Sequence, residues 1–269
     1  MNPDSAEKQF PKIMGILNVT PDSFSDGGNF FELETAVNRG KEMLSLGVDV
    51  VDVGGESTRP GSDPVDLKTE LDRVVPVIEA LSPFGKISID TTKPEVAARA
   101  AVAGASILND VSSSLAQVAS EQGMGWIAMH MQGIPKSMQV APAYSHVVKE
   151  VKGYLVKKAY EAKNLGIEEI WIDPGFGFGK TLSQNLELLA NISELVETGL
   201  MVAVGLSRKS MLGHLIAMSD GSEEAAPEYD RLEGSLISSG FAMLNGASLV
   251  RVHDVEETLV ARSIITGRI

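Results

Sequence analysis

The amino-acid sequence predicts an α/β fold, a single-domain (β/α)8 or TIM barrel that spans residues 1–269, with residues 1–11 as a flexible N-terminal tail. Eight short apolar runs alternate with segments of helical spacing, which is typical of parallel strands joined by helices. The chain has 269 residues, and one closed barrel uses about 250. A doubly wound open sheet has the same alternation and is the alternative fold.

The eight predicted strands are rich in apolar residues along their whole length. Such continuous runs indicate strands that are buried on both faces, as in a parallel sheet covered by helices. The predicted strands are residues 12–17, 48–53, 86–90, 105–110, 125–130, 169–173, 199–205 and 248–253.

Helical spacing is clearest in four segments between these strands, residues 33–47, 67–81, 147–166 and 232–246. Several of them end at a glycine just before the next strand, which predicts a left-handed helix cap. The most irregular stretches each follow a strand, and these are residues 18–32, 54–66, 131–146, 174–183 and 206–230. Barrel proteins build their sites on such loops, so polar residues there are the first candidates for function.

The charge balance argues against polyanionic partners. The chain carries 23 basic and 36 acidic residues, a net charge of −13, and such a field repels nucleic acid. It has no cysteine, which excludes disulfides and thiolate metal sites and is compatible with a reducing cytoplasm. No apolar run approaches the roughly 18 residues that cross a bilayer, so we expect a soluble, cytoplasmic protein without a membrane partner.

The stretch IWIDPGFGFGK, residues 170–180, places three glycines at alternate positions between an aspartate and a lysine. Its spacing fits neither of the two glycine-rich motifs that cradle phosphate. We therefore interpret this loop as a sharp turn that presents Asp173 at the end of a buried strand.

One group of polar residues at the predicted strand ends suits a planar heterocycle. Asp90, Asn109 and Asp173 offer acceptors, and the Asn109 amide also donates. Lys209 can donate to a carbonyl oxygen or a ring nitrogen.

A second group suits a phosphate ester. Arg59, Arg251 and His253 are cationic or can become so, and guanidinium groups match phosphate oxygens well. Asn18 is an uncharged oxygen ligand that could complete the shell of a Mg²⁺ ion held otherwise by phosphate and water.

Eight segments of the chain resemble, in order, the signature segments of bacterial dihydropteroate synthase, and the likeness covers nearly the whole chain after about residue 12. These segments are MGILNVTPDSFSDGG (14–28), DVGGESTRPGS (52–62), ISIDTTKPEVA (87–97), ILNDVSS (107–113), MHMQG (129–133), IDPGFGFGKT (172–181), SRKS (207–210) and RVHDV (251–255). The resemblance implies a (β/α)8 barrel that joins 6-hydroxymethyl-7,8-dihydropterin pyrophosphate to p-aminobenzoate, releasing pyrophosphate and 7,8-dihydropteroate for folate synthesis. It also implies a homodimer and a magnesium cofactor.

The resemblance assigns a role to each matching residue. The implied catalytic residues are Asp26, Arg59, Asp90 and Lys209. The implied pterin-binding residues are Asp90, Asn109, Met129, Asp173, Phe178 and Lys209. The implied pyrophosphate-binding residues are Thr58, Arg59, Arg251 and His253, and Asn18 is the implied metal ligand. The implied p-aminobenzoate pocket consists of Phe24, Thr58, Pro60, Lys209 and Ser210.

Some features depart from this pattern or leave alternatives open. Ile134 and Ser235 stand where the family often has threonine, and the role of residues 217–228 is open. Asp52 and Asp110 are interpreted as structural residues that form hydrogen bonds within the barrel or at its rim. Two other functions remain possible, a pterin-binding methyltransferase domain that passes a methyl group to a corrinoid, and a non-catalytic paralogue that binds pterin only.

Overall fold

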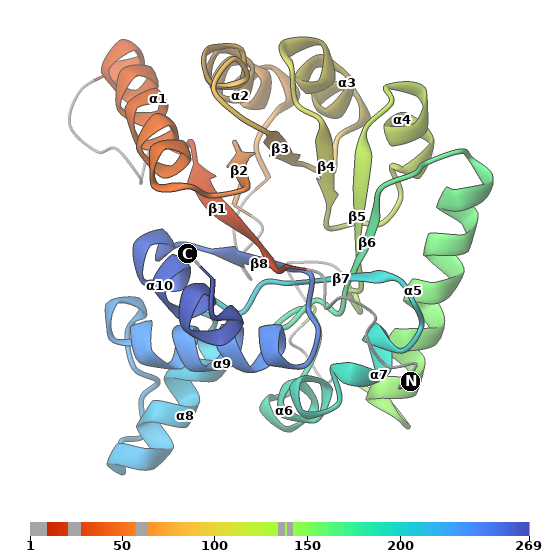
Figure 1. Ribbon diagram of the computed structural model, residues 1–269, viewed down its shortest axis with the longest axis vertical. Coiled ribbons are helices and arrows are strands. Elements are labelled where there is room, and N and C mark those ends of the chain that lie inside the picture. Colours follow the sequence, from red (N-terminus) through yellow and green to blue (C-terminus); the bar gives the residue numbers. More distant parts are fainter. Residues whose placement is uncertain (1–9, 21–27, 58–63, 134–137, 139–141, 269) are drawn as a thin grey trace.

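Eight parallel strands close into one barrel in the computed structural model, which describes residues 10–20, 28–57, 64–133, 138 and 142–268 (Figure 1). The strands are β1 (Lys12–Asn18), β2 (Val50–Gly54), β3 (Ile87–Asp90), β4 (Ile107–Asp110), β5 (Gly125–Met129), β6 (Ile170–Asp173), β7 (Met201–Val204) and β8 (Leu249–Val252). They pair in chain order, and β1 closes the barrel by pairing with β8 from Lys12 to Gly15. The predicted (β/α)8 barrel is therefore confirmed, and the open sheet is excluded by this closure.

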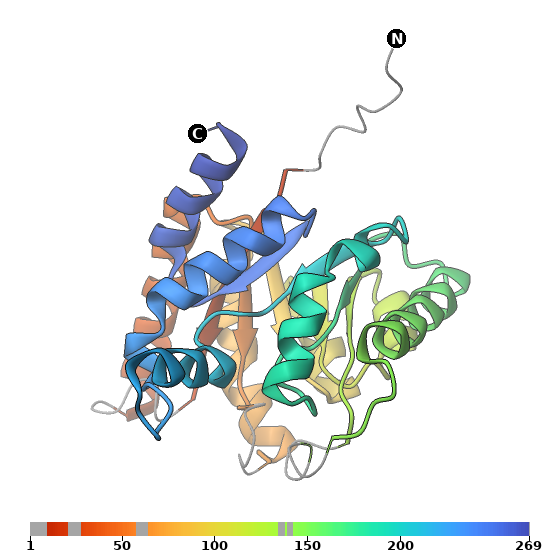
Figure 2. The same ribbon diagram turned by 90° about the horizontal axis from the view of Figure 1, so that it is seen from below.

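Helices surround the barrel and separate its strands from solvent (Figures 1 and 2). They are α1 (Gly28–Leu46), α2 (Leu67–Leu81), α3 (Pro94–Ala103), α4 (Ala116–Glu121), α5 (Val147–Asn164), α6 (Leu182–Ala190), α7 (Ser193–Val196), α8 (Ser210–Asp220), α9 (Leu232–Leu244) and α10 (Val255–Thr266), with a 3₁₀ helix η2 (Glu228–Asp230). The predicted glycine caps are confirmed at Gly47, Gly166 and Gly246, whose φ angles are 98°, 86° and 95°. Gly104, with a φ of 110°, ends α3 in the same way. None of the helices within the described ranges is long and apolar enough to span a membrane.

Three expectations about local structure need correction. Residues 206–230 were expected to be irregular but contain α8 and η2, because the run from Ser210 to Ala217 is apolar enough to pack one face against the barrel. Helix α1 begins at Gly28, inside a stretch also expected to be irregular. Of the expected N-terminal tail, Phe10 lies over the guanidinium of Arg262, 4.7 Å from the ring centroid, so this part of the tail is packed.

Two layers of side chains explain the position of the site. Inside the barrel, a small cluster comprises Met14, Val50, Ile107, Ile127, Trp171, Ala203 and Leu249, with one residue from each of seven strands. A larger cluster fills the space between the strands and the helices. Because side chains along a strand alternate between faces, the residues two and four positions beyond the interior cluster also point into the barrel, at its carboxyl end.

Candidate active site

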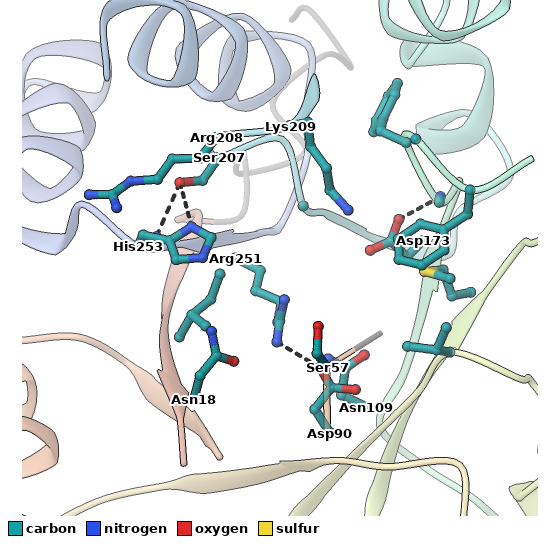
Figure 3. Close-up of a pocket in the computed structure, with 18 of the residues that line it drawn as sticks. Asn18, Ser57, Asp90, Asn109, Asp173, Ser207, Arg208, Lys209, Arg251 and His253 are labelled. Atoms are coloured by element: carbon teal, nitrogen blue, oxygen red, sulfur yellow. Dashed lines mark hydrogen bonds and ion pairs between the residues drawn. The ribbon is translucent and has the colours of Figure 1, made fainter. Parts of the chain in front are cut away.

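A cavity of about 940 Å³ opens at the carboxyl ends of the strands (Figure 3). Every strand or the loop after it contributes to its wall. The polar lining includes Asn18, Glu56, Ser57, Arg73, Asp90, Asn109, Asp173, Ser207, Arg208, Lys209, Ser210, Arg231, Arg251 and His253. The cavity is where sequence analysis expected the site.

Arg251 connects two buried carboxylates on the barrel floor. Its Nε donates to Asp52 Oδ2 at 2.6 Å, and its Nη2 donates to Asp90 Oδ2 at 2.7 Å. Asn109 Nδ2 donates to the same Asp52 oxygen at 3.0 Å. One guanidinium therefore faces two carboxylates, and the trio carries a net negative charge when both acids are ionised.

This environment shifts the acid–base behaviour of Asp90. Burial raises the pKa of Asp90 to about 7, while Arg251 opposes the shift and the charge of Asp52 adds to it. Its second oxygen, Oδ1, is buried and accepts no hydrogen bond from the described part of the chain. A buried acceptor of this kind fits a ligand that brings an N–H group.

Asp173 lies on the opposite side of the cavity from Asn18 and His253 (Figure 3). The Gly175 N–H donates to Asp173 Oδ1 at 2.7 Å, which fixes the plane of the carboxylate. Burial raises the pKa of Asp173, whereas the Gly175 N–H and the cations Lys209 and Lys180 oppose that shift. An acceptor held by a backbone N–H is suited to reading one edge of a ligand.

The glycine loop after β6 needs its glycines for steric reasons. Gly175, Gly177 and Gly179 have φ angles of 68°, 80° and 63°, a left-handed region that other residues rarely adopt. A Cβ on Gly175 would lie 2.0 Å from the carbonyl oxygen of His130. The interpretation of this loop as a tight turn beside Asp173 is therefore consistent with its backbone.

Lys180 holds the same loop together and is not among the predicted site residues. Its buried Nζ donates to the carbonyls of Gly175 at 2.9 Å, Phe178 at 3.0 Å and His130 at 3.3 Å. Burial lowers the pKa of Lys180 to about 7, and Asp173 opposes this shift. The lysine that ends the glycine run thus binds backbone carbonyls, which argues against a role in binding phosphate.

Apolar side chains line the slot next to Asp173. Val111, Met129, Met138 and Phe178 form one small buried cluster. Lys209 Nζ lies 4.2 Å from the centroid of the Phe178 ring, close enough for a cation–π contact. A flat ring can therefore lie on apolar atoms while its edges meet charged groups.

His253 and Asn18 lie together on the other side of the cavity (Figure 3). The Ser207 hydroxyl accepts a hydrogen bond from the backbone N–H of His253 at 3.1 Å. It also lies 3.1 Å from Nδ1 of the His253 ring, which fixes the orientation of the imidazole. The described ranges contain no group of three or more histidine, aspartate or glutamate side chains that could hold a metal ion alone.

Ten predicted site residues converge on this cavity. They are Asn18, Asp90, Asn109, Met129, Asp173, Phe178, Lys209, Ser210, Arg251 and His253. Five others lie outside the described residues, namely Phe24, Asp26, Thr58, Arg59 and Pro60. The structural interpretation of Asp110 is confirmed by the hydrogen bonds that it accepts from Leu115 N–H and Trp126 Nε1, at 2.7 and 3.2 Å.

Asp52 has a larger role than predicted, and Ser207 is a site residue outside the predicted set. Asp52 does bond within the barrel, as expected, but its partner Arg251 is a cavity residue, so Asp52 shapes the site as well. The available signal was its position two residues after Val50, because alternate side chains of a strand point to the same face. Ser207 begins the SRKS segment, but its contact with His253 spans 46 residues and could not be read from local sequence.

Comparisons with known proteins agree with this geometry. The family model described as "Pterin binding enzyme" matches residues 14–253. Dihydropteroate synthase of Escherichia coli K12 is 44% identical over 97% of this chain and 93% of its own length. The Mycobacterium leprae dihydropteroate synthase is 41% identical over 94% of this chain and 92% of its own.

Two solved structures are similar in fold as well as sequence. Yersinia pestis dihydropteroate synthase in complex with a sulfonamide drug has a TM-score of 0.86 and 42% identity, covering 96% of this chain and 94% of its own. The Xanthomonas albilineans enzyme with 4-aminobenzoic acid has a TM-score of 0.86 and 42% identity, covering 96% of this chain and 92% of its own.

Proposed function

Since the chain belongs to the dihydropteroate synthases of the pterin-binding enzyme family, we propose that it joins 6-hydroxymethyl-7,8-dihydropterin pyrophosphate to p-aminobenzoate in this cavity. The products are 7,8-dihydropteroate and pyrophosphate. Two relatives support the choice of substrates by what was bound to them, 4-aminobenzoic acid in one Xanthomonas albilineans structure and 7,8-dihydropteroate in another.

One observation carries the proposal, the convergence of Asp90, Asn109, Asp173 and Lys209 on a slot with apolar walls. The Asp173 carboxylate suits the 2-amino and N3–H edge of a pterin, because both of those groups donate. Asp90 Oδ1 offers a second buried acceptor. Lys209, above the Phe178 ring, is placed to donate to the opposite ring edge.

The pyrophosphate would lie toward His253, Arg251 and Asn18. Both basic residues of this set are also tied to protein partners, His253 to Ser207 and Arg251 to two aspartates. A Mg²⁺ ion fits there only if it takes most of its ligands from pyrophosphate and water, with Asn18 supplying a neutral oxygen, which is the way that proteins often hold this ion. When bound, the ion would neutralise charge on the departing oxygens.

The displacement itself would proceed by early departure of pyrophosphate, an SN1-like reaction. The bond from the pterin methylene carbon to oxygen breaks, pyrophosphate keeps the electron pair, and positive charge spreads into the dihydropterin ring. Asp90 and Asp173 are buried acids beside that ring, and their negative charge would stabilise it. The p-aminobenzoate amine, already unprotonated near neutral pH, then bonds to the carbon and loses one proton.

The direct test is to incubate purified protein with dihydropterin pyrophosphate, p-aminobenzoate and Mg²⁺ and to measure dihydropteroate and pyrophosphate by mass. Equimolar formation of both products is expected. Pterin binding without product would indicate a non-catalytic paralogue, and methyl transfer from methyltetrahydrofolate to a corrinoid would indicate the methyltransferase alternative.

The same family membership leads us to propose a homodimer through α9 and α10, which pack against each other at one side of the barrel (Figure 2). These helices expose five large apolar residues, namely Ile237, Phe241, Leu244, Val260 and Ile264. Exposed apolar side chains gathered on two neighbouring helices commonly mark a protein interface. Light scattering should give twice the 28.6 kDa chain mass, and Ile237→Glu with Ile264→Glu should give the monomer mass.

A further inference from the structure

Arg208 has an unusual backbone at the edge of the cavity. Its φ angle is 57°, and the only other non-glycine residue with a positive φ in the described ranges is Ser113. The left-handed region crowds the Cβ of any residue but glycine, so such strain persists only where the surroundings hold it. The question is which contacts hold Arg208.

Three other residues occupy the polar groups of Arg208. Its N–H donates to Ser235 Oγ at 2.9 Å, and its carbonyl accepts from Arg231 Nη1 at 2.9 Å. Its guanidinium forms a two-pronged ion pair with Asp254. Ser235 and Arg231 belong to the start of α9, and Asp254 follows β8, so two neighbouring elements clamp one residue.

Ser235 links this clamp together. Its buried hydroxyl donates to the Arg231 carbonyl at 2.6 Å and therefore presents its lone pairs to the Arg208 N–H. Arg231 is fixed in turn, because its Nε donates to the Ala226 carbonyl at 2.7 Å.

Arg208 lies between two cavity residues. Ser207 on one side holds the ring of His253 (Figure 3). Lys209 on the other side places its Nζ over the Phe178 ring. The φ angle of Arg208 sets the angle between these two neighbours. If it returned to the usual negative range, Lys209 would leave the cavity direction or Ser207 would leave His253.

We propose that Ser235 and Arg231 are positioning residues, which hold Arg208 in its left-handed conformation and so direct Lys209 into the pterin slot. The assignment rests on the proposed function for its consequence in binding, but the geometry it predicts can be measured without any ligand. Ser235 and Arg231 then act on the reaction through Lys209 and do not touch the ligand themselves.

The test compares Ser235→Ala with Ser235→Thr and with Ser238→Ala. Ser238 is a matched control, because it is equally buried on α9 and its hydroxyl donates only to the Ser235 carbonyl, at 3.2 Å. Crystal structures should show Arg208 φ negative and Lys209 Nζ displaced from Phe178 in Ser235→Ala alone. Calorimetry with a pterin ligand should show at least about tenfold weaker binding for Ser235→Ala, with Ser235→Thr restoring it.

Unchanged Arg208 geometry in Ser235→Ala, or the same loss of affinity in Ser238→Ala, would overturn the proposal. Should Ser235→Ala fail to fold, Arg231→Met removes the other backbone contact and is expected to give the same displacement of Lys209. A displaced Lys209 together with a wild-type protein that makes no dihydropteroate would sink the proposed function and leave the positioning role standing.

Discussion

Arg251 and Asp90 form an ion pair of 2.7 Å that joins the last strand of the barrel to the third. The same guanidinium binds Asp52 on the second strand at 2.6 Å. The pyrophosphate-binding role of Arg251 stays a prediction. The structure adds that Arg251 compensates two buried negative charges, so its removal should affect more than one ligand.

Arg251→Ala is expected to lower the free energy of unfolding by about 3 kcal/mol or more, because it leaves two buried carboxylates without their cation. Urea unfolding followed by circular dichroism measures this loss. The control is Lys68→Ala, which breaks the solvent-exposed pair with Asp72 and should leave the free energy of unfolding almost unchanged. Comparable losses in the two variants would contradict the compensating role.

His253→Ala should separate the two ligands, unlike Arg251→Ala. His253 is held by Ser207. The ion pairs that join Arg251 to Asp52 and Asp90 do not include it. We expect pyrophosphate-dependent affinity to fall about tenfold or more, and affinity for a pterin without phosphate to stay within about twofold. Calorimetry with both ligands gives the comparison, and equal weakening would show that His253 supports the pterin slot instead.

Asp173→Asn is expected to weaken pterin binding by about 1–3 kcal/mol, because an amide N–H then faces ligand N–H groups at a buried edge. The matched control is Asp110→Asn, a buried aspartate that holds the backbone of Leu115 and does not line the cavity. It should lower folding stability while the folded protein binds pterin normally. Unaltered pterin affinity in Asp173→Asn would remove Asp173 from the site.

Gly175→Ala and Gly199→Ala separate backbone strain from steric overlap. Both glycines have positive φ, 68° and 76°, but an added Cβ on Gly199 meets nothing within 4 Å. Gly199→Ala should therefore cost about 1 kcal/mol of stability and leave ligand binding intact. Gly175→Ala should cost more and weaken pterin binding, because its Cβ would overlap the His130 carbonyl and shift the N–H that holds Asp173. Equal stability of the two variants would contradict this account.

His130 should make the fold sensitive to acid. Burial lowers the pKa of His130 to about 3, with Lys180 adding to the shift, and the ring contacts those of Tyr144 and Tyr154. In the unfolded chain the pKa returns to about 6.5, so between these values the unfolded state binds the extra proton and stability falls as pH falls. The contribution of His130 is complete above about pH 7 and shrinks by about 1–2 kcal/mol by pH 5.

The comparison of His130→Gln with His146→Gln tests this sensitivity, since His146 is exposed at the start of α5. Unfolding free energies at pH 7 and pH 5 should differ less in His130→Gln than in wild type. His146→Gln should follow the wild-type difference. A wild-type pH difference retained in full by His130→Gln would mean that other groups cause it.

Much of the site could be predicted from local sequence alone. Strand residues alternate between faces, so a polar residue two positions beyond an interior apolar residue must point into the barrel at its carboxyl end. Trp171 and Asp173 illustrate this, and so do Ile107 and Asn109. The glycine run beside Asp173 was likewise readable, because alternate glycines before a lysine fit a tight turn better than a phosphate loop.

The residues that sequence analysis underestimated or missed owe their roles to contacts far apart in the chain. Arg251 reaches Asp90 across 161 positions, and Arg208 meets Ser235 across 27 and Asp254 across 46. No local period encodes such pairs, because they depend on the closure of β1 on β8 and on how α9 packs beside that seam. The sequence by itself determined which side chains face the barrel interior. Only the tertiary structure decided which of them form ion pairs and which residues hold a strained backbone, since both depend on distances that barrel closure and helix packing set.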